Sequence, residues 1–133
     1  MRIAALDVGD ARIGVAVSDE LGITAQGIGV VQRVGGKRDL EALAQMLGPY
    51  APERVVVGLP LGLSGADTDQ TREARAWADR LAAAVPVPVE LYDERFTTAI
   101  AARSAGDRTS EDSRAAAVLL EDWLAHHERE VAG

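Results

Sequence analysis

The hydrophobic pattern of this chain changes its period after the first third, and this change limits the possible folds more than any other feature. Residues 3–6 and 13–17 are short apolar runs separated by a turn that contains Gly and Asp, which is typical of a β-hairpin. After residue 54, short continuous apolar runs alternate with amphipathic segments of helical length. This order predicts an α/β fold in which antiparallel and parallel strands share one mixed sheet, with helices on both faces.

The individual elements can be located from the spacing of the apolar residues and from the Gly and Pro residues that interrupt it. We expect strands at residues 3–6, 13–17, 25–32, 55–57 and 87–91, and helices at residues 39–47, 69–84, 97–105 and 110–127. The valines at 55–57 indicate a strand that is buried on both faces. The last helix has an apolar stripe that should face the core, formed by Ala116, Leu119, Leu120, Trp123 and Leu124.

Composition narrows the class of protein. The 133 residues fit one domain, and a hydrophobic fraction of 47% is that of a folded globular protein. The chain has no cysteine, which excludes disulfides, thiolate metal sites and cysteine nucleophiles and suits a reducing cytoplasm. No apolar stretch approaches the roughly 20 residues of a membrane span, and a strand follows Met1 and Arg2 too closely for a signal peptide. We therefore expect one cytoplasmic domain, residues 1–133, with an acidic C-terminal tail from about residue 125.

Three acidic residues stand where predicted elements begin or end. Asp7 follows the first apolar run, Glu94 follows the run at 87–91, and Asp112 lies in the first turn of the last helix. Carboxylates at strand ends and at a helix start can converge, and a converged cluster binds hard divalent cations. Each acid also has an ordinary structural explanation, as a hairpin residue, a charged strand end or an acid favoured by the helix dipole. Only their convergence would distinguish a site from these explanations.

The net charge of −7 argues against a nucleic-acid partner at first sight, because phosphate binding depends on basic residues. Its distribution weakens that argument. Residues 121–133 carry −3, and the three candidate acids carry another −3 that bound metal would neutralise, which leaves −1 for the rest. Seven of the 14 basic residues fall within residues 33–38 and 95–114. A local basic rim is therefore compatible with an acidic chain.

The segment from Asp7 to Asp19 is the most specific motif. An Asp-x-Gly hairpin of this kind binds phosphate and metal in sugar kinases and actin-like ATPases, and it also occurs in ribonuclease H-like nucleases. A hairpin without any function is the third interpretation. Actin-like kinases enclose ATP between two such domains, and 133 residues provide only one. Length therefore favours the nuclease over the kinase.

Four ordered segments together resemble the YqgF/RuvX family, a branch of the ribonuclease H-like superfamily related to the Holliday-junction resolvase RuvC. They are Asp-x-Gly-x-x-Arg-Ile-Gly-Val-Ala-x-Ser-Asp at residues 7–19, Gly58-Leu59-Pro60, Asp93-Glu94-Arg95-x-Thr97-Thr98, and Asp112-x-x-Ala115-Ala116 followed by Leu119 and Trp123. The chain departs from the family pattern at Asp10, Gly62 and Ser64, which affects loop contacts with substrate and leaves the three acids in place.

This resemblance implies a ribonuclease H-like fold with a five-stranded mixed sheet flanked by helices on both faces. It implies that Asp7, Glu94 and Asp112 are the catalytic carboxylates and ligate Mg²⁺ or Mn²⁺, with two ions expected. The candidates for phosphate contact are Arg12, Arg95, Arg108 and Arg114, each of which could instead form a solvated salt bridge.

The function implied by the resemblance is that of a metal-dependent nuclease that hydrolyses phosphodiester bonds in structured nucleic acid. The expected role is processing of the 5′ end of the 16S ribosomal RNA precursor. One alternative is resolution of Holliday junctions in DNA, which requires a symmetric dimer for paired cuts. An alternative of another class is a module that binds RNA without cutting it. The partner in each case is nucleic acid, with a homodimer as one possible assembly and no membrane contact.

Overall fold

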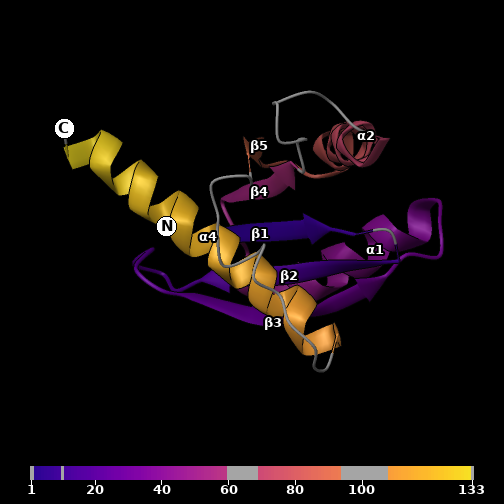
Figure 1. The fold of residues 1–133 in the computed structure, drawn as a ribbon, viewed down its shortest axis with the longest axis horizontal. Coiled ribbons are helices and arrows are strands. Elements are labelled where there is room, and N and C mark those ends of the chain that lie inside the picture. Colours follow the sequence, from indigo (N-terminus) through magenta and orange to yellow (C-terminus); the bar gives the residue numbers. More distant parts are fainter. Residues whose placement is uncertain (1, 10, 60–68, 94–107, 133) are drawn as a thin grey trace.

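The computed structural model describes residues 2–9, 11–59, 69–93 and 108–132, and its elements are arranged as a sheet with helices on both sides (Figure 1). In chain order they are β1 (Ile3–Val8), β2 (Arg12–Ser18), β3 (Ala25–Gln32), α1 (Lys37–Leu47), a 3₁₀ helix (Gly48–Tyr50), β4 (Arg54–Leu59), α2 (Asp69–Ala84), β5 (Val89–Asp93) and α4 (Arg108–Ala132). The predicted helix at 97–105 and the two family departures at Gly62 and Ser64 lie outside the described residues. No helix in the described ranges is both long enough and apolar enough to span a membrane.

The five strands form one mixed sheet in the order β3-β2-β1-β4-β5. β1 pairs antiparallel with β2, and β2 pairs antiparallel with β3. β4 pairs parallel with both β1 and β5. The predicted mixed sheet is therefore confirmed, with the hairpin strands on one side of β1 and the crossover strands on the other.

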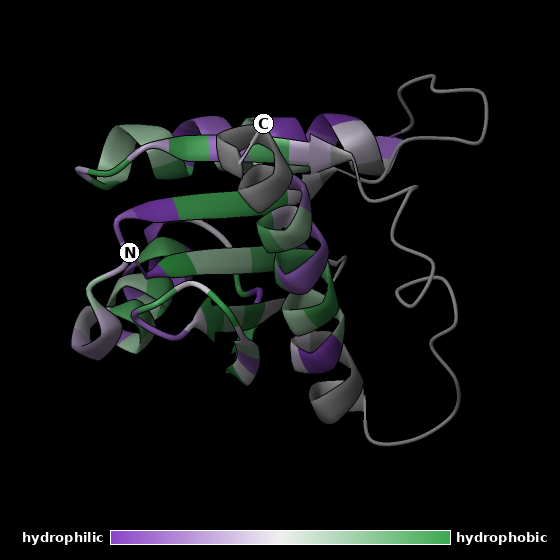
Figure 2. Ribbon diagram, turned by 90° about the vertical axis from the view of Figure 1, so that its left-hand side faces the viewer, coloured by the Kyte–Doolittle hydropathy of each residue, from purple (hydrophilic) through white to green (hydrophobic). Residues whose placement is uncertain are grey.

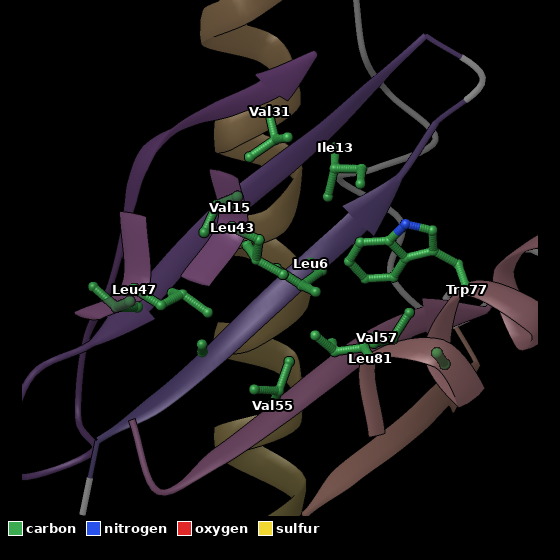
Figure 3. Packing of buried hydrophobic residues seen from close by; sticks show 13 residues of the cluster. Leu6, Ile13, Val15, Val31, Leu43, Leu47, Val55, Val57, Trp77 and Leu81 are labelled. Carbon is green, nitrogen blue, oxygen red and sulfur yellow. The ribbon is translucent and has the colours of Figure 1, made fainter. Parts of the chain in front are cut away.

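One face of the sheet packs against α1 and α2. Figure 3 shows this core, in which the indole of Trp77 from α2 points over Leu6 of the central strand. Trp77 and Leu81 of α2 are each 1% exposed, and so is Leu43 of α1. The alternating residues of β1 that face these helices include Ala4 and Leu6, as the strand period of two requires.

The other face packs against α4, which crosses the strands at a steep angle (Figures 1 and 2). Small residues line this contact on both sides, with Ala5 and Ala16 on the sheet and Ala115 and Ala116 on the helix. At Gly27 of β3 the approach is so close that a Cβ atom would lie 2.7 Å from the carbonyl oxygen of Ser113. The predicted apolar stripe of the last helix is confirmed as the surface that faces the sheet.

The observed ends of several elements differ from the expected ones. β1 continues through Asp7 and Val8 because its ladder with β2 extends to the pair Val8 and Ile13. β5 begins two residues later than predicted, after the prolines, and the carbonyl of Pro88 accepts a hydrogen bond from the Val55 N–H at 3.0 Å. α4 runs to Ala132, so the residues expected as a tail from about 125 are helical as far as 132.

α1 begins at Lys37, two residues before the expected start. The turn that precedes it uses Gly35 and Gly36 at positive φ (99° and 65°), which glycine adopts without strain. Asp39 lies inside the first turn, where its carboxylate accepts the N–H groups of Val34 and Gly35 at 2.9 and 3.2 Å. The acid that looked like a helix start in the sequence therefore ties the preceding loop to the helix.

Candidate active site

Asp7 is a buried acid on the central strand. It lies one residue before the end of β1, paired with Gly14 of β2, and only 6% of it is exposed. It follows Ile3 and Ala5 at the strand period of two, which places it on the face covered by α4. Because burial of a carboxylate is costly without a compensating partner, this position indicates a specific polar environment rather than a solvated turn.

The second predicted acid, Glu94, lies outside the described residues, but the strand that leads to it is described. β1, β4 and β5 run parallel, so their C-terminal ends meet at one edge of the sheet. Leu6 lies beside Val57, and two residues further along β4 Leu59 lies beside Asp93. Asp7 and Asp93 therefore occupy the same edge, two strand spacings or roughly 10 Å apart. Glu94 is the residue that follows Asp93 in the sequence.

The third predicted acid, Asp112, belongs to the first turns of α4, where the structure describes its backbone and not its side chain. The next residue, Ser113, packs its backbone against Gly27 of β3, and Ala115 and Ala116 are buried on the sheet. The helix carrying Asp112 thus covers the face that Asp7 occupies. Among the side chains that the structure describes there is no group of three acids or histidines that could hold a metal. Convergence of the three carboxylates remains a prediction.

The turn that follows Asp7 is held by backbone and side-chain hydrogen bonds. The Gly9 N–H donates to the Arg12 carbonyl at 2.8 Å, and a Cβ atom at Gly9 would lie 2.9 Å from that same oxygen. Arg33, just past β3, donates from its backbone N–H to the Ala11 carbonyl at 2.9 Å. Its Nη1 donates to the Gly9 carbonyl at 2.8 Å and lies 3.6 Å from a carboxylate oxygen of Glu73 on α2.

Arg33 belongs to the basic segment at residues 33–38, for which the sequence indicated no specific contact. Its only local signal is that it is a basic residue directly after a strand, and many surface residues share that description. Its partner Gly9 lies 24 positions away in the sequence, so the contact depends on the antiparallel pairing of β2 with β3.

The four arginines predicted to contact phosphate are placed unequally. Arg12 begins β2 beside the turn and is half-buried, while Arg114 is exposed on α4. Arg108 is the first residue of α4 and is described by its backbone, and Arg95 lies outside the described residues. Their assembly into one phosphate-binding surface stays a prediction.

Three aromatic side chains have structural roles. Trp77 and Trp123 are 1% and 3% exposed, so they belong to the core and are not exposed for stacking on bases. Tyr92 of β5 donates from its hydroxyl to the Asp122 carboxylate at 2.6 Å and lies 3.1 Å from Nδ1 of the exposed His126. These contacts fasten α4 to the edge strand.

Comparison with known proteins shows which family the sequence matches. A family model described as RuvX, Holliday junction resolvase, matches residues 1–126. A relative from Myxococcus xanthus (strain DK1622), named "Putative pre-16S rRNA nuclease", is 43% identical over an alignment of 135 positions. The alignment covers 96% of this chain and 89% of the relative. A relative of the same name from Anaeromyxobacter dehalogenans (strain 2CP-C) is 44% identical over 132 residues, covering 93% and 96%.

Solved structures agree on the fold. RuvC of T. thermophilus, in complex with a Holliday junction substrate, superposes with a TM-score of 0.61 at 19% identity over 96% of each chain. The Holliday junction resolvase of fowlpox virus has a TM-score of 0.53 at 15% identity, covering 95% of this chain and 99% of that one. At such low identity these likenesses show the ribonuclease H-like fold alone. Because the family model spans nearly the whole chain and both relatives exceed 40% identity, this chain belongs to the RuvX family, a family of nucleases that hydrolyse phosphodiester bonds.

Proposed function

We propose that this chain is a metal-dependent nuclease that cuts structured RNA, and that its substrate is the 5′ region of the 16S ribosomal RNA precursor. Two observations support the proposal. The relatives that are 43% and 44% identical carry the name of a pre-16S rRNA nuclease. The observation that carries the chemistry is the buried carboxylate of Asp7 at the C-terminal end of the central strand. The absence of cysteine agrees with a cytoplasmic location, which is part of the proposal.

Asp7, Glu94 and Asp112 would hold the metal. Nucleases of this kind generally use divalent cations. All three side chains are carboxylates, the donor type that hard cations such as Mg²⁺ and Mn²⁺ prefer. Asp7 fits this role because it is buried beneath α4, where Ala115 and Ala116 let the helix lie close to the sheet. Two bound cations would supply an activated water and stabilise the leaving oxygen of an in-line displacement.

The phosphate backbone of the substrate would be held by Arg12, Arg95, Arg108 and Arg114. A guanidinium group binds phosphate with two parallel hydrogen bonds, so a few arginines suffice to orient the scissile bond. Arg12 is part of the hairpin next to Asp7, and exposed Arg114 follows Asp112 by two residues on α4. Since the whole chain carries −7, binding would depend on these local charges and would weaken steeply with salt.

The test is a cleavage assay on two labelled substrates, a 16S precursor fragment and a four-way DNA junction, each with and without Mg²⁺ or Mn²⁺. Wild type is compared with Asp7→Asn and with Asp79→Asn, a matched change at an exposed acid on α2, across the sheet from Asp7. Metal-bound groups contribute several kcal/mol to stabilisation of the transition state. Asp7→Asn should therefore lower the rate of precursor cleavage by about 100-fold or more. Equal cleavage by wild type and Asp7→Asn would refute the proposal.

A second candidate function is resolution of Holliday junctions, which the description of the family model favours. A resolvase makes paired cuts and therefore needs a symmetric dimer. Metal-dependent cleavage of the junction with no cleavage of the precursor, together with a dimer by light scattering, would select this alternative. Binding of the precursor without cleavage of either substrate would instead select a non-cleaving RNA-binding module.

A further inference from the structure

Arg33 joins three elements around the turn that follows Asp7. Its guanidinium donates to the Gly9 carbonyl at 2.8 Å, and its backbone N–H donates to the Ala11 carbonyl at 2.9 Å. The same Nη1 lies 3.6 Å from Glu73 of α2. One residue at the end of β3 therefore contacts both sides of the β1–β2 turn and faces a carboxylate on a helix beyond it.

The exposure of the two charged partners indicates which contact dominates. The Arg33 side chain is 17% exposed, whereas the Glu73 side chain is 58% exposed. An ion pair that is open to water on one side is weak. The 2.8 Å hydrogen bond from the charged guanidinium to the Gly9 carbonyl is of the stronger, charge-assisted kind. The contact with Gly9 is therefore the one that fixes the turn.

The turn is closely packed at Gly9. The Gly9 N–H is bonded to the Arg12 carbonyl, and there is no room for a side chain at Gly9 because its Cβ would lie 2.9 Å from that oxygen. Gly9 follows Asp7 by two residues, so a shift of its carbonyl changes the direction of the strand end that carries the Asp7 carboxylate. Displacements well below 1 Å matter at a metal site, where ligand distances are narrowly defined.

We propose that Arg33 is a positioning residue for the nuclease site, which holds the β1–β2 turn so that the Asp7 carboxylate is set for metal binding. This inference rests on the proposed function, since it assigns Asp7 to the metal. Arg33 itself touches neither metal nor substrate in this proposal. It acts through the Gly9 carbonyl.

The experiment compares Arg33→Met, Arg33→Lys and Arg38→Met in the full chain. Methionine keeps an unbranched apolar stem and removes every donor, while lysine keeps one charged donor. Arg38 is exposed on the first turn of α1 and serves as a control matched in charge and in substitution. For each variant we would measure the Mn²⁺ concentration that gives half-maximal cleavage, kcat at saturating Mn²⁺, the thermal midpoint, and hydrogen exchange at the Gly9 amide.

Arg33→Met should raise the Mn²⁺ midpoint or lower kcat on the order of 10-fold, with faster exchange at Gly9, and Arg33→Lys should recover part of that loss. Arg38→Met should keep the wild-type Mn²⁺ midpoint, because it removes the same charge at a position away from the β1–β2 turn. If Arg33→Met lowers the thermal midpoint but leaves the Mn²⁺ midpoint and kcat equal to those of Arg38→Met, Arg33 is only a structural residue and the inference is wrong. If wild type cuts nothing, the proposed function fails separately. Calorimetric Mn²⁺ binding by the same variants then decides the role of Arg33, with equal affinities overturning it.

Discussion

Gly27→Ala should separate α4 from the sheet at the point where the helix carries a predicted metal ligand. A Cβ atom at Gly27 would lie 2.7 Å from the carbonyl oxygen of Ser113 and 2.9 Å from its carbonyl carbon. Both are backbone atoms, so no side-chain rotation can relieve the overlap. Ser113 directly follows Asp112, and a shift of the helix start therefore moves the candidate ligand as well.

The size of the effect follows from two opposing terms. Overpacking of a fixed interface costs about 1–3 kcal/mol. Replacing glycine by alanine within a strand returns roughly 0.5–1 kcal/mol, because the unfolded chain loses less entropy on folding. The net loss of about 1–2 kcal/mol corresponds to a fall in Tm of roughly 3–10 °C for a chain of this size.

The assay is a thermal melt followed by cleavage kinetics at a temperature where both proteins are folded. We expect a rate loss on the order of 10-fold beyond any loss of folded protein, because a small displacement of a ligand is enough to disturb the site. Gly48→Ala is the matched control, since nothing lies within 4 Å of its Cβ and its backbone is right-handed helical. If Gly27→Ala keeps both the Tm and the rate of Gly48→Ala, the close contact between α4 and β3 does not position the site.

Three further predictions concern stability. The N–H of Ile23 donates to Asp19 and holds the pKa of that carboxyl below its ordinary value of 3.8. The charge therefore stabilises the fold above pH 3.8, and this contribution is lost as the pH falls through the lowered pKa. Asp19→Asn should thus lower the Tm at neutral pH, with a difference from wild type that narrows in acid melts; a constant difference would contradict this. Leu81→Ala should cost about 2–5 kcal/mol in urea denaturation, because the side chain is 1% exposed in the core beneath α2, and a cost near zero would mean that this core is loosely packed. Trp123→Phe removes the indole N–H that donates to the Glu90 carboxylate and should cost roughly 1–2 kcal/mol in the same assay; an unchanged urea midpoint would show that the bond is not formed in solution.

The elements that could be predicted from the sequence are those with clear period and clear boundaries. The helix expected at residues 69–84 is α2, and the strand expected at 25–32 is β3, with the same bounds. The strand expected at 87–91 is shifted by two residues, because the pairing of β5 with β4 and not its own apolar run decides where it starts. Local pattern identifies the elements, whereas pairing sets their ends.

The candidate site, like the secondary-structure elements, could be predicted from the sequence only in part. The position of Asp7 at the end of the central strand was predictable, since an apolar run followed by Asp and Gly leads to a sheet edge. Its burial under α4 was not, because it depends on small residues from separate parts of the chain, including Gly27 and Ala116, meeting in space. The contact of Arg33 with Gly9 depends likewise on strand register. Contacts of this kind have no local signature.

The most direct test of the proposed site is calorimetric titration of Mn²⁺ into the intact protein. Wild type is compared with Asp7→Asn, Glu94→Gln and Asp112→Asn, and with Asp79→Asn as the control on the opposite side of the sheet. If the three carboxylates share one metal site, each of the three variants should bind Mn²⁺ with an affinity lower by about 10-fold or more. Asp79→Asn should bind Mn²⁺ as wild type does. Binding of equal strength in wild type and all three variants would contradict a metal centre formed by Asp7, Glu94 and Asp112.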